Sequence, residues 1–253
     1  MRTVAWFSCG AASAVAAKMA LDRDPSTVVA RCVVENEHPD NDRFAADVAR
    51  WLGVEIVTLR SAKYRDCWDV WEKRRFLNGP KGALCTVEMK KRVRQDFEEP
   101  GDVQVYGFTW EETERAERFR ENNPEIKARF PLIERRFSKA RCYYEITQAG
   151  LTRPAMYRLG YHNANCVGCV KGGAGYWNKI RRDFPSTFDR MAALEESIGA
   201  TVLREKALRE LRPDEGRHED LMLPDCGLFC GENESSRVPP GGKGDAGTPG
   251  SGT

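Results

Sequence analysis

Short apolar runs alternate with helical patterns along the first quarter of the chain. Three of the runs predict buried β-strands, at residues 3–7, 28–34 and 54–59. Between them, an alanine-rich segment at residues 11–21 predicts one helix. Apolar side chains at helical spacing in residues 40–52, closed by Gly53, predict another. Strands and helices in this order are typical of a parallel sheet with crossover helices.

The pattern continues into the second half of the chain. Residues 103–108 predict a fourth strand, whereas residues 129–137 are predicted to be irregular. Further helices are expected at residues 63–74, 86–97, 110–121, 139–149 and 186–198. We therefore expect an α/β protein with a doubly wound, mostly parallel sheet, helices on both faces, and a helical C-terminal region that carries cysteines.

Composition divides the chain into three regions. Residues 1–170 contain the strand–helix pattern and form an α/β domain. Residues 171–231 form a helical extension that ends in a cysteine-bearing arm. Residues 232–253 contain one valine and no aromatic residue, so this tail cannot bury enough apolar surface to fold and is expected to be disordered.

The overall composition, 41% hydrophobic and 31% charged in 253 residues, fits a soluble globular protein. No apolar run approaches the ~20 residues that span a membrane, and the N-terminus does not have the pattern of a secretory signal. We expect a cytoplasmic protein with no membrane contact. The net charge of +2 neither favours nor excludes nucleic acid as a partner.

The junction between the first strand and the first helix has the residues of an anion site. A serine hydroxyl, a glycine and the free N–H groups of a helix start favour phosphate or sulfate, although GxGxxG and GxxxxGK(S/T) motifs are absent. The alternative is an ordinary tight turn. The candidate ligands are Ser8, Cys9, Gly10, Ala11 and Ser13. Cys9 is either a nucleophile activated by the helix start or a small residue selected for packing.

Two further places suit a nucleotide. Glu35 follows the second strand, where a carboxylate accepts a hydrogen bond from a ribose hydroxyl, with Glu37 behind it. Arg115 and Arg118 follow the fourth strand and are suited to pair with phosphate or sulfate. The alternative for both arginines is surface pairing with glutamates one helical turn away.

Nine cysteines in a chain expected to be cytoplasmic point away from a disulfide framework. Three of them are interpreted as packing residues: Cys32, Cys67 and Cys142. Cys166 and Cys169 form a CxxC pair in a glycine-rich loop, and two thiolates at this spacing can share one metal centre. Cys85 supplies a third thiolate.

A fourth ligand is not settled by the sequence. The candidates are Cys226, Cys230 and His162, and a site with three ligands is the alternative. Three thiolates with an open iron position would form a reactive cluster, whereas four thiolates would suit structural zinc. Cys226 is also a candidate nucleophile, because it lies on an arm between the last predicted helix and the tail.

Together these stretches resemble the phosphoadenosine phosphosulfate (PAPS) reductase family of the adenine nucleotide α-hydrolase superfamily. FSCGAASAV resembles the family's phosphate loop, CTVEMKK its cysteine–lysine segment, and YGFTWEETERAER its Gly-Leu-Arg-x-Glu segment. The most specific match is PLIERRF with PAMYRLGYHNANCVGC, which is similar to the family's P-L-x-x-W, P-x-Y-x-x-G-Y and C-x-x-C motifs. DCGLF resembles the C-terminal Glu-Cys-Gly-x-His motif that carries the catalytic cysteine.

The resemblance implies that residues 1–170 bind an adenine nucleotide and that the protein reduces a sulfonucleotide, PAPS or APS. The Cys226 thiolate would attack the sulfur atom, and a thioredoxin- or glutaredoxin-type dithiol would release sulfite. The resemblance adds two residues near the nucleotide anion, Lys90 and Gly107. It also implies a 4Fe–4S cluster, with zinc as the alternative, bound by Cys85, Cys166 and Cys169. We take Cys230 as the fourth ligand.

Three departures from the family pattern leave other functions open. Thr86 replaces one cluster cysteine, Phe229 replaces the histidine of the catalytic arm, and Cys230 has no counterpart. Divergent members of this kind occur in phage and mobile elements. The alternatives are an ATP-dependent sulfur transferase that modifies nucleic acid through an iron–sulfur centre, and a non-catalytic module that binds a nucleotide or a metal.

Overall fold

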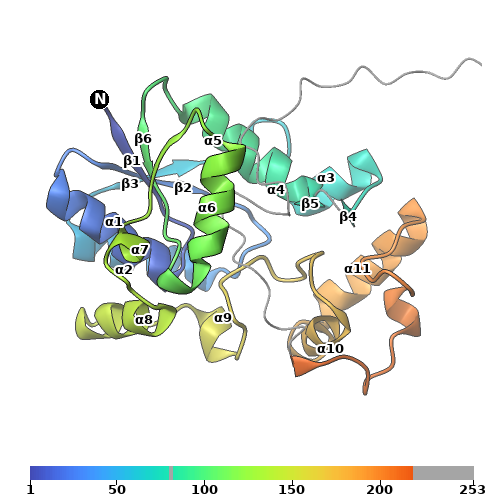
Figure 1. The fold of residues 1–253 in the computed structure, drawn as a ribbon. Coiled ribbons are helices and arrows are strands. Elements are labelled where there is room, and N and C mark those ends of the chain that lie inside the picture. Colours follow the sequence, from blue (N-terminus) through green and yellow to red (C-terminus); the bar gives the residue numbers. More distant parts are fainter. Residues whose placement is uncertain (80–81, 219–253) are drawn as a thin grey trace, which may run out of the picture.

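The computed structural model describes residues 1–79 and 82–218 of the chain, and a five-stranded sheet lies at its centre (Figure 1). The strands are β1 (Thr3–Trp6), β2 (Val28–Cys32), β3 (Ile56–Leu59), β6 (Val103–Val105) and β7 (Lys127–Arg129). They lie in the order β3-β2-β1-β6-β7, and every neighbouring pair is parallel. The prediction of an α/β fold with a parallel sheet is confirmed.

The strand β7 was not predicted from the sequence. Residues 129–137 were expected to be irregular, and no strand was expected before them. Val103 pairs with Lys127, and Val105 pairs with Arg129, at the edge of the sheet. Because β7 consists of Lys, Ala and Arg, it has no apolar run by which it could be recognised. Charged side chains on an edge strand also discourage pairing with another chain.

Helices pack on both faces of the sheet (Figure 1). One face is covered by α1 (Ala11–Arg23), α2 (Asp40–Leu52), α7 (Pro131–Glu134) and α8 (Lys139–Gln148). The other face is covered by α5 (Arg92–Phe97) and α6 (Thr113–Asn122), which follows the 3-10 turn η2 (Trp110–Glu112). In β1, Ala5 and Phe7 belong to the first apolar cluster, whereas Val4 and Trp6 belong to the second. A strand buried on both faces reads as a continuous apolar run, which is why the sequence predicted it.

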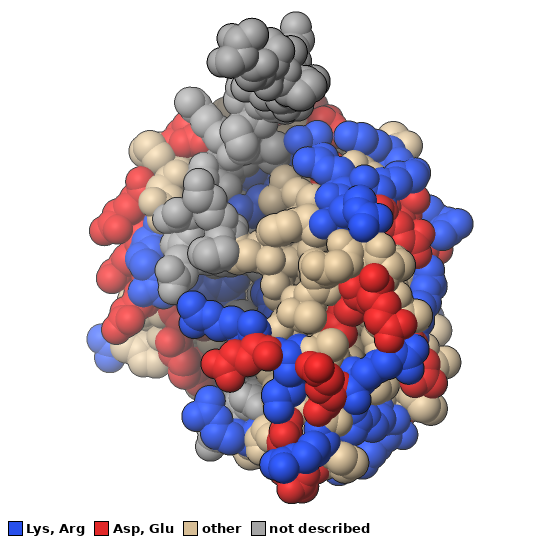
Figure 2. All heavy atoms as spheres, turned by 90° about the vertical axis from the view of Figure 1, so that its right-hand side faces the viewer, with Lys and Arg blue, Asp and Glu red and all other residues tan. Residues whose placement is uncertain are grey.

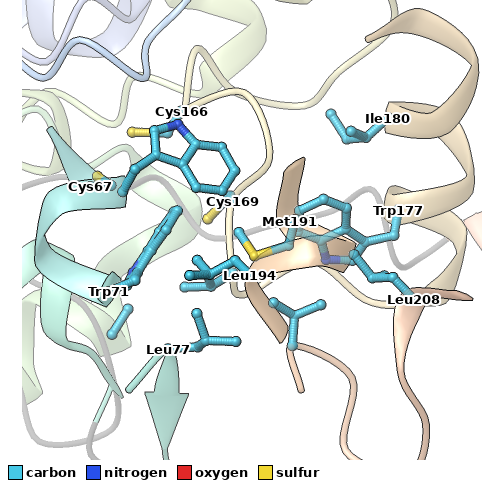
Figure 3. Packing of buried hydrophobic residues seen from close by; sticks show 14 of the residues in the cluster. Cys67, Trp71, Leu77, Cys166, Cys169, Trp177, Ile180, Met191, Leu194 and Leu208 are labelled. Carbon is cyan, nitrogen blue, oxygen red and sulfur yellow. The ribbon is translucent and has the colours of Figure 1, made fainter. Parts of the chain in front are cut away.

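A third apolar cluster lies beside the sheet (Figures 1 and 3). The elements around it are α3 (Cys67–Arg74), β4 (Asn78–Gly79), β5 (Gly82–Ala83), α4 (Leu84–Thr86), the π-helical turn η1 (Val87–Lys91), α9 (Ala155–Arg158), α10 (Ala174–Asp183), α11 (Pro185–Ile198) and the 3-10 turn η3 (Leu208–Glu210). Trp71 and Trp177 are fully buried in it. The cluster therefore joins residues from both sides of the predicted boundary at residue 170.

Local signals explain where several helices begin and end. Gly53 and Gly199 both have φ of +70° and terminate α2 and α11 in a conformation that glycine adopts without strain. The Asp66 side chain accepts a hydrogen bond from an N–H in the first turn of α3. This cap explains why α3 begins at Cys67, later than the predicted start at residue 63.

Some predictions concern parts of the chain outside the described residues. These are the disordered tail at residues 232–253 and the two C-terminal cysteines, Cys226 and Cys230. None of the helices in residues 1–79 and 82–218 combines the length and apolar character needed to span a lipid bilayer.

Candidate functional site

The topology of the sheet marks one edge as the candidate ligand site. The chain order reverses at β1, because β2 and β3 lie on one side of it and β6 and β7 on the other. In open parallel sheets, ligands bind at this reversal, outside the carboxyl ends of the two central strands. Ser8 follows β1 and Gly107 follows β6, so both predicted residues lie at this edge.

The turn after β1 leaves the start of α1 without a side-chain cap. Cys9 has φ of +58°, which is uncommon for a residue with a side chain, and Gly10 is the N-cap residue. The Ser13 hydroxyl accepts from the Ser8 N–H at 3.1 Å and donates to the Gly10 carbonyl at 3.0 Å. The turn is thus held by its own serine, and the first N–H groups of α1 keep the partial positive charge that favours an anion.

Gly107 packs directly against the start of α1. A Cβ atom at this position would lie 2.6 Å from the Ser13 Cα and 2.7 Å from the Ser13 nitrogen. No side chain fits in that space, so glycine allows the end of β6 to approach the helix backbone. The contact with a nucleotide that the resemblance implies for Gly107 stays a prediction.

Cys9 has the environment of a packing residue. Its side chain is fully buried, and its Sγ lies 3.7 Å from the Asn41 carbonyl oxygen of α2. Burial raises the pKa of the Cys9 thiol well above its ordinary value. A nucleophilic cysteine needs an accessible thiolate, so the structure favours the packing interpretation.

A buried set of charges links the edge of the sheet to η1. The Lys90 ammonium donates to the Glu37 carboxylate at 3.1 Å, and Arg31 lies 3.7 Å from the second oxygen of the same group. All three side chains are less than a tenth exposed. Lys90, which the resemblance places beside the nucleotide anion, is therefore held by a carboxylate from the loop after β2. Neither Arg31 nor this pairing was evident from the sequence.

The other predicted nucleotide ligands differ in their surroundings. Glu35 is exposed and forms a loose ion pair of 3.9 Å with an arginine that follows β3. Arg118 is exposed and pairs at 3.9 Å with a glutamate one turn away, which is the surface alternative considered above. Arg115 is more buried, pairs with Glu112 one turn away at 2.7 Å, and stacks 4.3 Å over the Phe108 ring. Arg115 is therefore the arginine held near the end of β6.

Four cysteines from three segments lie in or against the third apolar cluster. Figure 3 shows Cys67, Cys166 and Cys169 among its apolar side chains. They are Cys67 at the start of α3, Cys85 in α4, and Cys166 and Cys169 in the loop before α10. Hydrogen bonding with the Cys166 and Cys85 sulfurs raises the pKa of Cys67 well above its ordinary value. The hydrogen bond from Cys67 in turn lowers the pKa of Cys85.

The environment of Cys85 favours the thiolate. The hydrogen bond from Cys67 is the largest contribution that lowers the pKa of Cys85, and the positive charge of Lys171 is the next. Burial acts in the opposite direction and raises this pKa. Trp71 Nε1 is buried and has no hydrogen-bond partner of ordinary geometry among the described residues. Its N–H group nevertheless contributes to the lowered pKa of Cys85.

The CxxC loop is held in place by Tyr176 of α10. The Tyr176 hydroxyl accepts from the Cys169 N–H at 2.9 Å and donates to the Cys166 carbonyl at 3.2 Å. Gly168 has φ of +76°, and a Cβ there would lie 2.7 Å from the Thr187 methyl group. Glycine is needed between the two cysteines both for this backbone conformation and for the close contact with α11.

Asn36 connects the cysteine group to the edge of the sheet. Its side-chain oxygen accepts from the Cys67 N–H at 2.7 Å, and its carbonyl accepts from the Val167 N–H at 2.8 Å. Asn36 immediately precedes Glu37, the partner of Lys90. One loop after β2 therefore positions the start of α3, the CxxC loop and the buried charges.

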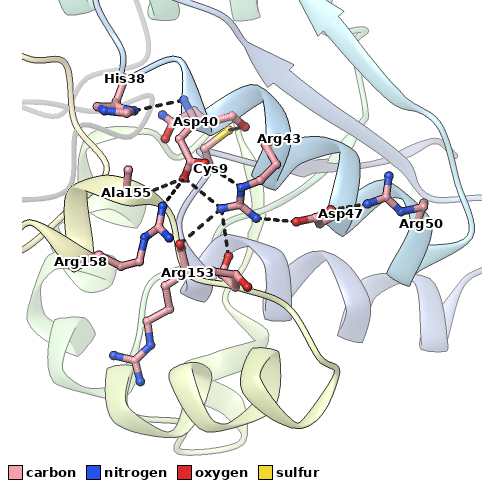
Figure 4. A network of polar contacts seen from close by, with 11 residues as sticks. Cys9, His38, Asp40, Arg43, Asp47, Arg50, Arg153, Ala155 and Arg158 are labelled. Atoms are coloured by element: carbon pink, nitrogen blue, oxygen red, sulfur yellow. Dashed lines mark hydrogen bonds and ion pairs between the residues drawn. The ribbon is translucent and has the colours of Figure 1, made fainter.

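A second polar network fastens the segment before α9 to α2 (Figure 4). Asp40 accepts from the Ala155 N–H at 2.7 Å, and its hydrogen bonds from Arg43 lower the pKa of Asp40. Arg43 also donates to the carbonyls of Thr152 and Arg153. This segment precedes the CxxC loop, so α2 supports that loop from a second direction.

The surface on the side of α3 and α11 is hollowed near its middle, and Lys and Arg side chains lie beside the hollow (Figure 2). The chain matches no protein-family model, and no curated protein matches it.

The donor set of the cysteine group fits a thiolate-bound centre. Four thiols, a lowered pKa at Cys85 and a mostly apolar surrounding are the features of such sites. Among residues 1–79 and 82–218, however, no three or more Cys, His, Asp or Glu side chains are arranged so that they could hold a metal ion. Binding would therefore require the four thiols to turn toward a common centre.

Cys67 is the residue of this group that sequence reasoning missed. It was interpreted as a packing residue, because it lies in an apolar helical pattern and has no close cysteine in sequence. The structure places it beside Cys85 and Cys166. One signal was available: Asp66 is a capping residue, and a cysteine directly after a cap lies at a helix start, where thiolates are stabilised.

Proposed function

We propose that this protein is a reductase of adenine sulfonucleotides, of the APS or PAPS class, with a cysteine-bound centre next to its nucleotide site. The observation that carries the proposal is the position of Asn36, which follows β2, the strand next to β1, and hydrogen-bonds to both Cys67 and the CxxC loop. The four described cysteines suffice for a thiolate centre. Cys226 is then not needed as a ligand and is available as the nucleophile.

The nucleotide would bind with its anionic end at the uncapped start of α1. The first N–H groups of α1, the Ser8 hydroxyl and the Arg115 guanidinium supply donors and positive charge there. Lys90 would be shared between this anion and Glu37. Because these groups are held before substrate arrives, they stabilise developing negative charge without having to reorganise.

The reaction proceeds through a thiolate. The Cys226 sulfur forms a bond to the sulfonyl sulfur, and the bond from that sulfur to the phosphate oxygen breaks, which leaves S-sulfocysteine and the nucleotide. A thioredoxin- or glutaredoxin-type dithiol then attacks the Cys226 sulfur and releases sulfite. The second thiol of the reductant resolves the mixed disulfide, so the dithiol is oxidised and the Cys226 thiol is regenerated.

Cys67, Cys85, Cys166 and Cys169 would hold a 4Fe–4S cluster, with zinc as the alternative. A bound cluster would add a centre whose charge and redox state respond to nearby hydrogen bonds. The hydrogen bond from Cys67 is the main cause that lowers the pKa of Cys85, and burial is the main cause that raises the pKa of Cys9. The positive charge of Lys90 makes a smaller contribution that lowers the pKa of both thiols.

The proposal is tested by metal analysis and a turnover assay on protein purified without oxygen. Iron with acid-labile sulfide and sulfite release from APS or PAPS with reduced thioredoxin are expected. Cys67→Ser should lower the iron content, whereas Cys142→Ser, a buried cysteine in the first apolar cluster, should not. Cys226→Ser should abolish sulfite release and leave the metal content unchanged.

Other results would contradict parts of the proposal. Loss of iron in Cys226→Ser with full iron in Cys67→Ser would make Cys226 the ligand and overturn its role as nucleophile. Stoichiometric zinc without iron would make the cysteine group a structural site. Turnover that requires ATP and a nucleic-acid acceptor, with no sulfite from either sulfonucleotide, would replace the reductase by a sulfur transferase.

A further inference from the structure

We propose that a surface on α8 and η2 binds a single-stranded nucleic acid. We call this surface the arginine–aromatic strip, and its members are Trp110, Arg136, Phe137, Arg141 and Tyr144. It lies on the side of the molecule away from α11 (Figure 1). The inference goes beyond the reductase proposal and does not depend on it.

Positive charge is concentrated in this part of an otherwise balanced chain. From Arg135 to Arg158 the sequence has six Lys and Arg residues and one acidic residue, Glu145, whereas the whole chain has a net charge of +2. Arg141 pairs with Glu145 at 2.7 Å. Arg135, Arg136 and Arg153 are exposed, and no carboxylate of the described chain lies within ion-pair distance of them. Exposed guanidinium groups without carboxylate partners suit phosphate.

Aromatic rings lie between these arginines. Trp110 is 44% exposed and Tyr144 is 52% exposed, and both are large rings at the surface. The Arg136 guanidinium lies 5.3 Å from the Trp110 ring centre, and Arg141 lies 5.4 Å from Phe137 and 5.0 Å from Tyr144. The strip is thus continuous, since the Trp110 N–H also donates to the Phe137 carbonyl at 2.8 Å.

The backbone of Arg136 is an independent observation that points to function. The Arg136 N–H donates to Ile133 and the Phe137 N–H donates to Leu132, which is the hydrogen-bond pattern of a Schellman motif at the end of α7. The residue with positive φ in this motif is usually glycine, but here it is Arg136, with φ of +54°. A surface contact between an arginine and a tryptophan does not require a strained backbone, so the strain at Arg136 points to a functional role for this residue.

The position of the strip is suited to a strand that approaches the candidate site. Trp110 follows the end of β6 three residues after Gly107. At the start of α8, the Lys139 ammonium donates to the His162 carbonyl at 2.9 Å, in the loop that leads to Cys166. A bound strand would therefore run close to both the nucleotide edge and the cysteine loop.

The chemistry favours a single strand over other anionic partners. Unpaired bases have open faces that stack on Trp and Tyr, while the backbone phosphates pair with Arg, and both groups alternate along the strip. A duplex hides its base faces, and an acidic peptide has no rings to stack on Trp110. The exposed rings therefore identify the partner, because charge alone would serve any polyanion.

The test is a binding assay with a fluorescein-labelled 20-nucleotide oligo(dT) on the full-length protein. Two phosphate contacts, from Arg136 and Arg141 of the strip, predict a slope of log K against log salt of about −1.4. Trp110→Ala should weaken binding by roughly 5- to 150-fold, as removal of one stacking platform does. A duplex of the same length should bind at least about tenfold more weakly, because its bases cannot stack.

Arg136→Gly separates binding from folding. Glycine relieves the left-handed strain, so the thermal midpoint should be unchanged or higher, while affinity should fall roughly fivefold and the salt slope should become shallower by about 0.7. The matched control is Arg190→Ala, which removes another arginine stacked on a tryptophan, 4.3 Å over Trp68. Arg190 lies on α11, and its loss should leave affinity unchanged.

The proposal is overturned by several results. The first is absence of oligo(dT) binding at 50 mM salt. The second is that Trp110→Ala and Arg136→Gly bind oligo(dT) as tightly as Arg190→Ala does. The third is that a duplex or polyglutamate binds as tightly as oligo(dT). Each assay reads binding and not turnover. Failure of the strip and failure of the sulfonucleotide proposal are therefore distinguishable.

Discussion

The close contact between Gly107 and α1 allows a sharp prediction about stability. In Gly107→Ala the new Cβ would lie 2.6 Å from the Ser13 Cα and 2.9 Å from the Ala12 carbonyl carbon. These are backbone atoms, so no rotation of a side chain relieves the clash. α1 is itself packed against α7, α8 and the sheet in the first apolar cluster, so it cannot shift without disturbing that packing.

The expected cost follows from these contacts. Overpacking of a core costs about 1–3 kcal/mol, and a clash with backbone belongs at the upper end, at about 3 kcal/mol. For a chain of this size, each kcal/mol lowers the melting temperature by about 2–4 °C, so the midpoint should fall by about 6–12 °C. Differential scanning calorimetry measures the shift. The affinity for an adenine nucleotide should fall as well, because the start of α1 would be displaced.

Gly53→Ala is the matched control. Gly53 has φ of +70°, but nothing lies within 4 Å of a Cβ built there. Its replacement should cost only the left-handed strain, about 1 kcal/mol or about 2–4 °C. If Gly107→Ala lowers the midpoint no more than Gly53→Ala does, a Cβ atom at position 107 does not clash with the backbone of α1, and the predicted close contact between β6 and α1 is wrong.

Three further predictions follow from buried charges and thiols. The hydrogen bond from Arg2 lowers the pKa of Asp102, so the ionised carboxylate stabilises the fold above the ordinary carboxyl pKa of about 3.9, and this contribution is lost as pH falls through the lower folded pKa. Asp102→Asn should cost about 1–3 kcal/mol at pH 7, and the melting temperatures of variant and parent should approach each other as the pH falls below about 3.9. Lys90→Met leaves the buried Glu37 carboxylate without its closest partner, so the free energy of unfolding measured in urea should fall by about 3 kcal/mol. A decrease below about 0.5 kcal/mol would contradict the pairing of Lys90 with Glu37. Cys9 should resist iodoacetamide at pH 8 in the folded protein and react after denaturation, as read by peptide mass spectrometry.

The elements that the sequence predicted well are those whose signals are local. β1 and β2 are buried on both faces and appear as apolar runs, and α2 ends at Gly53 because that residue adopts positive φ without strain. β7 was missed because an edge strand of charged residues is defined by its partner β6 and not by its own pattern. The coarse fold was therefore predictable, but the position of the edge strand in the chain was not.

The candidate site was predicted only in part. The turn at Ser8 and the loop with Cys166 and Cys169 were found from residue types and spacing alone. Cys67 was not, since 17 intervening residues separate it from Cys85. Which of the acidic residues after β2 is buried was also undecided, and the structure exposes Glu35 and buries Glu37.

The sequence by itself determined the class of fold, the direction of the strands and the local geometry of turns, because hydrophobic period, capping residues and glycine act over a few residues. Only the tertiary structure decided which distant groups meet. The side chain and carbonyl of Asn36 join α3 and the CxxC loop, and Lys90 finds Glu37 across the edge of the sheet. Such contacts depend on the packing of elements against each other, and residues far apart in the chain carry no local record of it.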